Sequence, residues 1–126
     1  DHNREKFEQK KALAVETAKF INTKYGEEIC KVELVDQYFN MREKIEPVYH
    51  IVQTAIDAME LLGIEPKIQP IRGGTDGARL SFMGLPCPNI FAGGLNFHGK
   101  FEYVSLDVMS QATNVILKII ELYLNK

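Results

Sequence analysis

A glycine-rich stretch in the middle of the chain has the residue types of an anion-binding loop. It reads Ile71-Arg-Gly-Gly-Thr-Asp-Gly-Ala-Arg79 and lies between a predicted short strand and a predicted helix. Glycines that adopt positive φ leave consecutive backbone N–H groups free to bind an anion, and a helix amino end adds a positive field. The candidate substrate-binding residues are therefore Arg72, Gly73, Gly74 and Thr75, and the expected anion is a carboxylate.

The same stretch has a purely structural interpretation. The glycines then serve a sharp turn, Thr75 caps the following helix, and Asp76 complements the helix dipole. A nucleotide is a weaker ligand for it than a carboxylate, because neither G-x-x-x-x-G-K-[ST] nor G-x-G-x-x-G occurs. Both interpretations predict a turn followed by a short helix that runs to Phe82.

A second candidate is His98, in a glycine-bounded loop that reads Gly-Gly-Leu-Asn-Phe-His-Gly-Lys over residues 93–100. The loop follows a predicted apolar strand at 89–92, and open α/β folds place ligands at the carboxyl ends of their strands. An imidazole can ligate a metal or act as a general base, although an ordinary loop histidine has the same signature. One histidine does not complete a metal site. No catalytic residue is assigned within the chain.

The periodicity of apolar residues predicts the elements that position these loops. Helices are expected over 3–24 and 47–62, and from a Ser105 cap to the end of the chain. Strands are expected over 29–38, which alternates, over 66–71, and over the apolar segment 89–92. From Pro47 onward the order of helix, strand, helix, strand, helix predicts an α/β fold with a layered sheet. The earlier helix and strand cannot bury their apolar faces alone.

Composition narrows the class of protein. The 126 residues are 45% hydrophobic and 25% charged with a net charge of −2, which is ordinary for a globular protein and makes a nucleic acid a poor partner. The longest apolar stretch, 115–124, contains Lys118 and Glu121 and is too short for a membrane span. Cys30 and Cys87 form no metal or disulfide pattern, so a cytoplasmic location is expected.

Three strings, taken together, resemble one known protein family. Arg-Gly-Gly-Thr-Asp-Gly at 72–77, Asn-Phe-His-Gly-Lys at 96–100 and Tyr-Phe-Asn-Met-Arg-Glu-Lys at 38–44 closely resemble the carboxyl-terminal part of the M20 family of di-zinc exopeptidases. The resemblance covers almost the whole chain. It implies an α/β catalytic domain that carries two zinc ions per subunit, with a smaller ferredoxin-like lid domain inserted into it.

The resemblance also implies a division of the chain and a set of roles. Residues 1–42 would be the last helix and strand of the lid, and residues 43–126 would be the carboxyl-terminal portion of the catalytic domain. His98 would ligate one zinc, and the loop from Arg72 to Thr75 would hold the carboxylate end of a peptide. The other ligands and the general-base glutamate would precede Asp1. Because residue 1 is not Met, we expect a fragment. Leu95 stands where relatives would have an aromatic residue or a histidine.

The activity implied by the resemblance is a zinc-dependent aminopeptidase that releases the first residue of tripeptides, with this chain inactive alone. Two alternatives remain open: another amidohydrolase of the same family, or a metal-free module that binds a carboxylate or a peptide. The expected partner is a short peptide, and a homodimer is possible. We also expect exposed apolar surface on the chain, and therefore self-association.

Overall fold

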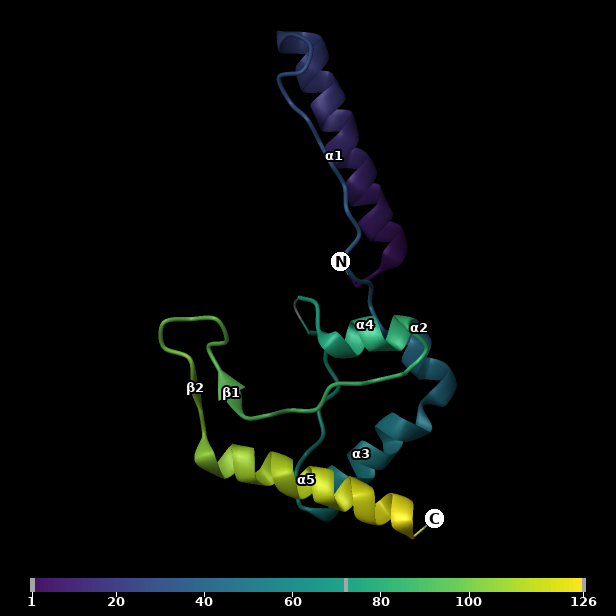
Figure 1. Cartoon of the computed structure of the whole chain (residues 1–126), viewed down its shortest axis with the longest axis vertical. Helices are drawn as coiled ribbons and strands as arrows, with labels where there is room; N and C mark the ends of the chain where they lie inside the picture. Colours follow the sequence, from purple (N-terminus) through teal and green to yellow (C-terminus); the bar gives the residue numbers. More distant parts are fainter. Residues whose placement is uncertain (1, 72, 126) are drawn as a thin grey trace.

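The computed structural model describes residues 2–71 and 73–125. This part of the chain is mostly helical, with one small two-stranded sheet (Figure 1). In chain order the elements are α1 (Arg4–Tyr25), α2 (Arg42–Ile45), the 3-10 helix η1 (Glu46–Val48), α3 (His50–Leu61), α4 (Asp76–Phe82), β1 (Gly94–Leu95), β2 (Tyr103–Val104) and α5 (Leu106–Leu124).

Capping residues start the two longest helices, and a glycine ends the first of them. The side chain of Asn3 accepts a hydrogen bond of 2.9 Å from the Lys6 N–H and starts α1, and Gly26 ends that helix with φ at 124°. The Ser105 hydroxyl accepts a hydrogen bond of 3.5 Å from the Val108 N–H and starts α5. The predicted first and last helices are thereby confirmed.

The predicted strands are wrong for the described part of the chain. Segments 31–40, 64–71 and 85–93 are extended but belong to no strand, and the only ladder described there joins β1 to β2, with Gly94 opposite Val104 and Leu95 opposite Tyr103. A strand needs a neighbour at ladder distance to pair its N–H and C=O groups, and an apolar pattern alone does not supply one. The structure therefore supports the α/β expectation only in part: segment 31–40 runs mainly along α1, and segments 64–71 and 85–93 run among the other helices, without forming a layered sheet (Figure 1).

The helix predicted over 47–62 corresponds to the 3-10 helix η1 followed by α3, with a break at Tyr49, and the short helix α2 precedes it. Pro47 lies in the first turn of η1, where its missing N–H has no helical partner to lose, as expected for a residue that starts a helix. The main helix packing is between α3 and α5. Its buried residues are small: Thr54 and Ala58 on α3, and Ala112 and Val115 on α5.

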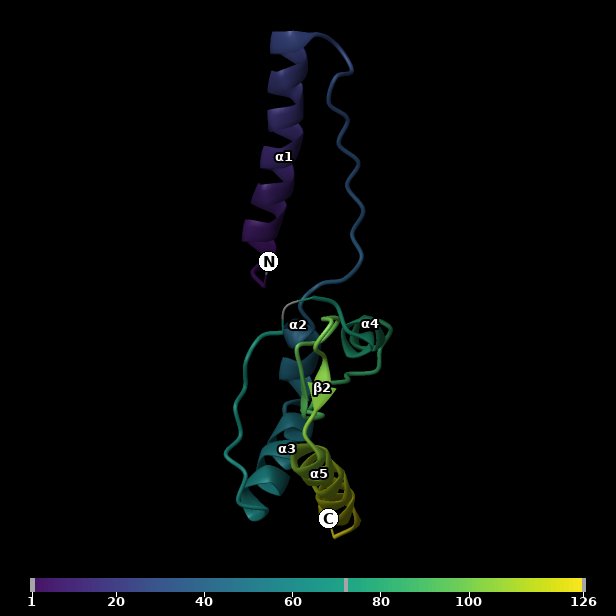
Figure 2. The same ribbon diagram turned by 90° about the vertical axis from the view of Figure 1, so that its left-hand side faces the viewer.

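Helix α1 and the extended segment after it form an arm, residues 4–38, that projects from the other elements (Figures 1 and 2). Within the arm, the side-chain amide of Asn22 donates to the Cys30 carbonyl at 2.9 Å and its oxygen accepts from the Cys30 N–H at 2.8 Å. The Lys11 ammonium lies 3.0 Å from the Asp36 carboxylate. The extended segment is thus held to α1 by side chains and not by a sheet.

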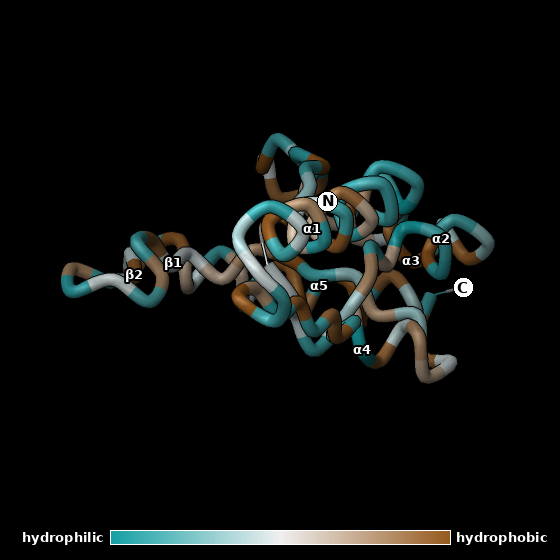
Figure 3. The backbone as a smooth tube through the Cα atoms, turned by 90° about the horizontal axis from the view of Figure 1, so that it is seen from above, coloured by the Kyte–Doolittle hydropathy of each residue, from teal (hydrophilic) through white to brown (hydrophobic). Residues whose placement is uncertain are grey.

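Many large apolar side chains are exposed, as the sequence predicts. They occur on both halves of the molecule, and examples are Ile29 at 61%, Val35 at 71%, Leu117 at 60% and Leu124 at 80% exposure. Figure 3 shows apolar positions along the whole trace, including the β1–β2 hairpin that reaches away from the helices. No helix within residues 2–71 and 73–125 combines the length and apolar character that a membrane crossing requires.

Candidate functional site

Thr75 ends the glycine-rich stretch and starts α4. Its backbone is extended, with φ −133° and ψ 158°, and its Oγ1 accepts a hydrogen bond of 3.2 Å from the Ala78 N–H. One turn later the Ser81 hydroxyl donates to the Gly77 carbonyl at 2.7 Å and accepts from the Cys87 N–H at 3.0 Å. The structural part of the sequence interpretation, a turn followed by a capped helix that ends at Phe82, is therefore confirmed.

The glycines of the loop are required for different reasons. Gly73 has φ at 106°, a conformation that other residues adopt only with strain, and the space around it is open. Gly74 lies against the ring of Tyr38, so that a Cβ added there would be 2.5 Å from Tyr38 Cδ1. At Gly77 an added Cβ would be 2.5 Å from the carbonyl oxygen of Cys87. Gly74 and Gly77 are thus required because other atoms lie so close to their backbone that a Cβ has no room.

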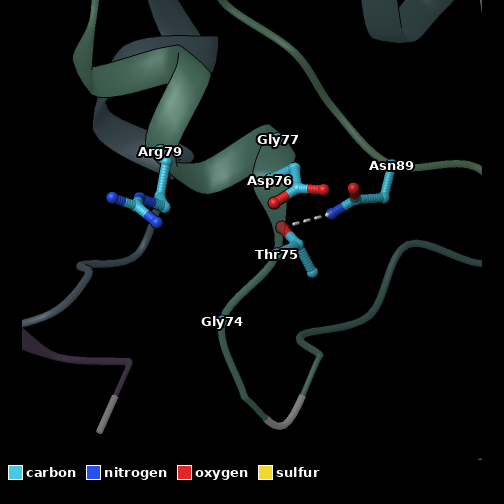
Figure 4. Close-up of a pocket in the computed structure, with 6 residues that line it drawn as sticks. All are labelled: Gly74, Thr75, Asp76, Gly77, Arg79 and Asn89. Carbon is cyan, nitrogen blue, oxygen red and sulfur yellow. Dashed lines mark hydrogen bonds between the residues drawn. The ribbon is translucent and has the colours of Figure 1, made fainter.

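An open pocket lies at this loop and is lined by Gly74, Thr75, Asp76, Gly77, Arg79 and Asn89 (Figure 4). The Asn89 side-chain amide crosses it and donates to Thr75 Oγ1 at 3.2 Å. Together with the Ala78 N–H, Asn89 occupies both acceptor positions of that hydroxyl. The Thr75 O–H is therefore left as a donor, suited to an acceptor such as a carboxylate oxygen.

The charges around the pocket do not favour an anion by themselves. Asp76 and Arg79 both line it and both are exposed, so one negative and one positive charge are present. In Figure 4 the Arg79 side chain points away from Thr75, whereas the Asp76 carboxylate lies near Asn89. Arg72, the predicted carboxylate-binding residue, lies outside the described residues. The two charged residues that line the described part of the pocket therefore give it no net charge.

His98 is held at the surface by a tightly hydrogen-bonded turn inside the β1–β2 hairpin. Its φ is 63° and that of Asn96 is 56°, so two non-glycine residues have left-handed backbones here. The His98 N–H donates to a Glu102 carboxylate oxygen at 2.8 Å, and the Gly99 N–H donates to the Asn96 carbonyl at 2.9 Å. The backbone at His98 is thus fixed while the imidazole is exposed.

The described residues do not bring His98 into the Thr75 pocket, whose lining residues all lie between Gly74 and Asn89. Within residues 2–71 and 73–125, no group of three or more histidine, cysteine, aspartate and glutamate side chains is placed to hold a metal. Zinc takes four ligands, of which three or four come from protein. His98 therefore offers one metal ligand and not a metal site.

The sequence prediction missed two contributors to the pocket region. Asn89 is the one polar side chain of the predicted apolar strand 89–92, and that polarity was a usable signal for a ligand-facing position. Tyr38 is 36 positions before Gly74, and nothing in the spacing of the chain indicates their contact. Only the folded arrangement of the chain could reveal it.

Comparison with known proteins gives one consistent result. The chain is 64% identical over 123 residues to a peptidase T of Alkaliphilus oremlandii, a match that covers 98% of this chain and 30% of the relative. The resemblance to peptidase T extends over almost the whole of this chain. Peptidase T of Clostridium novyi is 59% identical over 123 residues, and that of Geobacillus thermodenitrificans is 58% identical over 126 residues.

These peptidase T sequences confirm the resemblance predicted from the three strings. The chain spans about 30% of the length of the curated relatives that it matches. No family model matches it.

Proposed function

We propose that this chain is part of a zinc-dependent aminopeptidase that releases the first residue of tripeptides. The observation that supports the proposal most is the identity of 56–64% to peptidase T over 94–100% of the chain. In this proposal residues 1–42 belong to a ferredoxin-like lid domain and residues 43–126 to the end of an α/β catalytic domain. The setting is cytoplasmic, and the partner is a short peptide.

His98 is a suitable zinc ligand because its imidazole is exposed on a backbone held by the Glu102 carboxylate. The described residues do not complete the set of ligands. The proposal therefore gives this chain one zinc ligand, and it places the other ligands and the general-base glutamate in segments of the enzyme that precede these residues.

The glycine-rich loop has a separate task, which is to bind the carboxylate end of the peptide. The Thr75 O–H is left as a donor by its two bound N–H groups, and hydrogen bonds to an ionised acceptor are stronger than neutral ones. Arg72 supplies the positive charge that Asp76 and Arg79 together do not. A carboxylate bound at a fixed distance from the first peptide bond is available only in a peptide of matching length, so in this proposal the loop selects short substrates.

The test is a chimera in which this chain replaces the 123 matching residues of the Alkaliphilus oremlandii peptidase T. It is assayed with a tripeptide and with the same tripeptide amidated at its carboxyl end. Arg72→Ala should raise KM for the free tripeptide about 10-fold or more and leave KM for the amide unchanged, because it removes a charge-assisted contact. His98→Ala should lower both the bound zinc and kcat.

Matched controls use residues of the same types away from both loops. Arg42→Ala removes an exposed arginine paired with Glu46, and His50→Ala removes an exposed histidine at the start of α3. Both should leave KM, kcat and metal content within about twofold of the parent, since exposed ion pairs contribute little. Full zinc content and unchanged kcat in His98→Ala would show that the ligand assignment is wrong. If Arg72→Ala keeps the preference for the free tripeptide over the amidated one, the assignment of the loop as the carboxylate-binding site is wrong.

A further inference from the structure

The aromatic ring of Tyr38 lies on the backbone of the substrate loop. Three of its ring atoms, Cδ1, Cε1 and Cγ, would be 2.5, 2.6 and 3.0 Å from a Cβ added at Gly74. Gly74 itself has no left-handed φ, so its glycine is explained by this close approach and not by backbone strain. The contact uses the ring and not the phenol oxygen.

The neighbouring residue fixes the position of Tyr38. The ring of Phe39 lies between Phe82 on α4, at a centroid distance of 5.8 Å, and Phe7 on α1, at 6.4 Å. The Arg4 guanidinium lies 4.6 Å from the centre of the Phe39 ring. Because a half-buried aromatic cluster anchors residue 39 to α4, the backbone of residue 38 cannot move freely relative to the loop that precedes α4.

The loop needs such a support. Gly73 has open space around it, and glycine is the residue with the widest backbone freedom. Beyond Gly74, Thr75 is fixed by the α4 cap and by Asn89. Among the described residues, the ring of Tyr38 is what comes against the loop at Gly74, the residue between the open Gly73 and the capped Thr75.

We infer that Tyr38 is a positioning residue for the substrate loop: its ring holds the backbone at Gly74 in the arrangement that binds the peptide carboxylate. The inference rests on the proposed function of the loop. It also ties the site to the arm: Tyr38 is the last residue of the arm, and only a displacement that breaks the Phe39–Phe82 contact would withdraw the ring from Gly74. Carboxylate binding and the placement of the arm are then coupled through one side chain.

The test compares the ratio of KM for the amidated tripeptide to KM for the free tripeptide in the chimera. Tyr38→Ala should lower this ratio about 5-fold or more, a size typical of coupling between residues in contact. Tyr38→Phe keeps the ring and should keep the ratio. Tyr49→Ala is the matched control, because Tyr49 has the same 44% exposure as Tyr38 and approaches no glycine. A general loss of folded protein would lower activity toward both peptides and leave the ratio unchanged.

A double-mutant cycle supplies the second measurement, and it applies also if Tyr38→Ala folds poorly, since Tyr38→Leu can replace it. Gly74→Ala pushes the ring aside and should lower the ratio in the parent, but much less in a chain that already lacks the ring. Equal effects of Gly74→Ala in both backgrounds, or an unchanged ratio in Tyr38→Ala, would overturn the inference. If Arg72→Ala also leaves the ratio unchanged, the proposed function of the loop fails; if Arg72→Ala collapses it, only the role of Tyr38 fails.

Discussion

Replacement of Thr75 by alanine separates the structural and the functional roles of one hydroxyl. In the structure, Thr75 Oγ1 accepts from the Ala78 N–H and from the Asn89 amide, each at 3.2 Å. Loss of a helix N-cap costs about 1 kcal/mol of folding stability. The Asn89 amide is exposed and can bond to water instead, so its loss adds little. We therefore expect Thr75→Ala to destabilise the chimera by about 1 kcal/mol.

The effect of the same change on substrate binding has another origin. A hydrogen bond to a charged group contributes about 1.5–3 kcal/mol, and the lower end applies here because the pocket is open to water. About 1.5 kcal/mol corresponds to a rise of about 10-fold in KM for the free tripeptide. KM for the amidated tripeptide should not change. Thr75→Ser retains the hydroxyl and should retain both KM values.

Ser105→Ala provides the matched control, because Ser105 caps α5 in the same way and is not among the residues that line the pocket. It should cost a similar free energy of unfolding, measured by urea denaturation, without raising KM. If Thr75→Ala and Ser105→Ala change KM equally, the hydroxyl of Thr75 acts only as a helix cap. The reasoning that assigns its free donor to a carboxylate would then be refuted.

Two further predictions concern the arm and the exposed surface. The Lys11 ammonium donates hydrogen bonds to the carboxylates of Asp36 and Glu8. These bonds, above all the one to Asp36, raise the pKa of Lys11 above its ordinary value of 10.5. The ion pair therefore stabilises the arm below pH 10.5 and is lost as the pH rises through the folded-state pKa. The difference in melting temperature between the parent and Asp36→Asn should be constant from pH 8 to 10 and shrink above that; a difference that persists at pH 12 would contradict it. We also expect the isolated chain to self-associate, and Val35→Glu with Leu117→Glu should reduce the mass measured by analytical ultracentrifugation, whereas a parent chain that is already a cooperative monomer would count against this.

Local signals in the sequence predicted the helices well. Gly26, Thr75 and Ser105 end or start helices through hydrogen bonds within about four positions of the chain, and the structure has these helix ends within one residue of where the sequence places them. Pro47 also acted locally, since it lies in the first turn of the helical segment that was predicted to start there, although that segment begins as a 3-10 helix and becomes α3 only at His50. Short-range chemistry is thus visible in the order of residues alone.

Pairing and close approach are different, because they depend on residues that are distant in sequence. The segments predicted as strands are extended but have no ladder in the described chain, since a strand exists only beside a partner. The loop from Arg72 to Thr75 has the composition of a binding site. The composition does not show, however, that Asn89 also lines the pocket at this loop or that the ring of Tyr38 lies against Gly74.

By itself the sequence determined the first and last helices, the caps at Thr75 and Ser105, the two candidate loops and the resemblance from which their chemistry is proposed. The tertiary structure alone decided that His98 is displayed on a hairpin turn and that Gly74 is a glycine because of a ring 36 positions away. The physical reason is range: caps and turns are set by hydrogen bonds within a few residues, whereas packing against a glycine is set by where the rest of the chain passes.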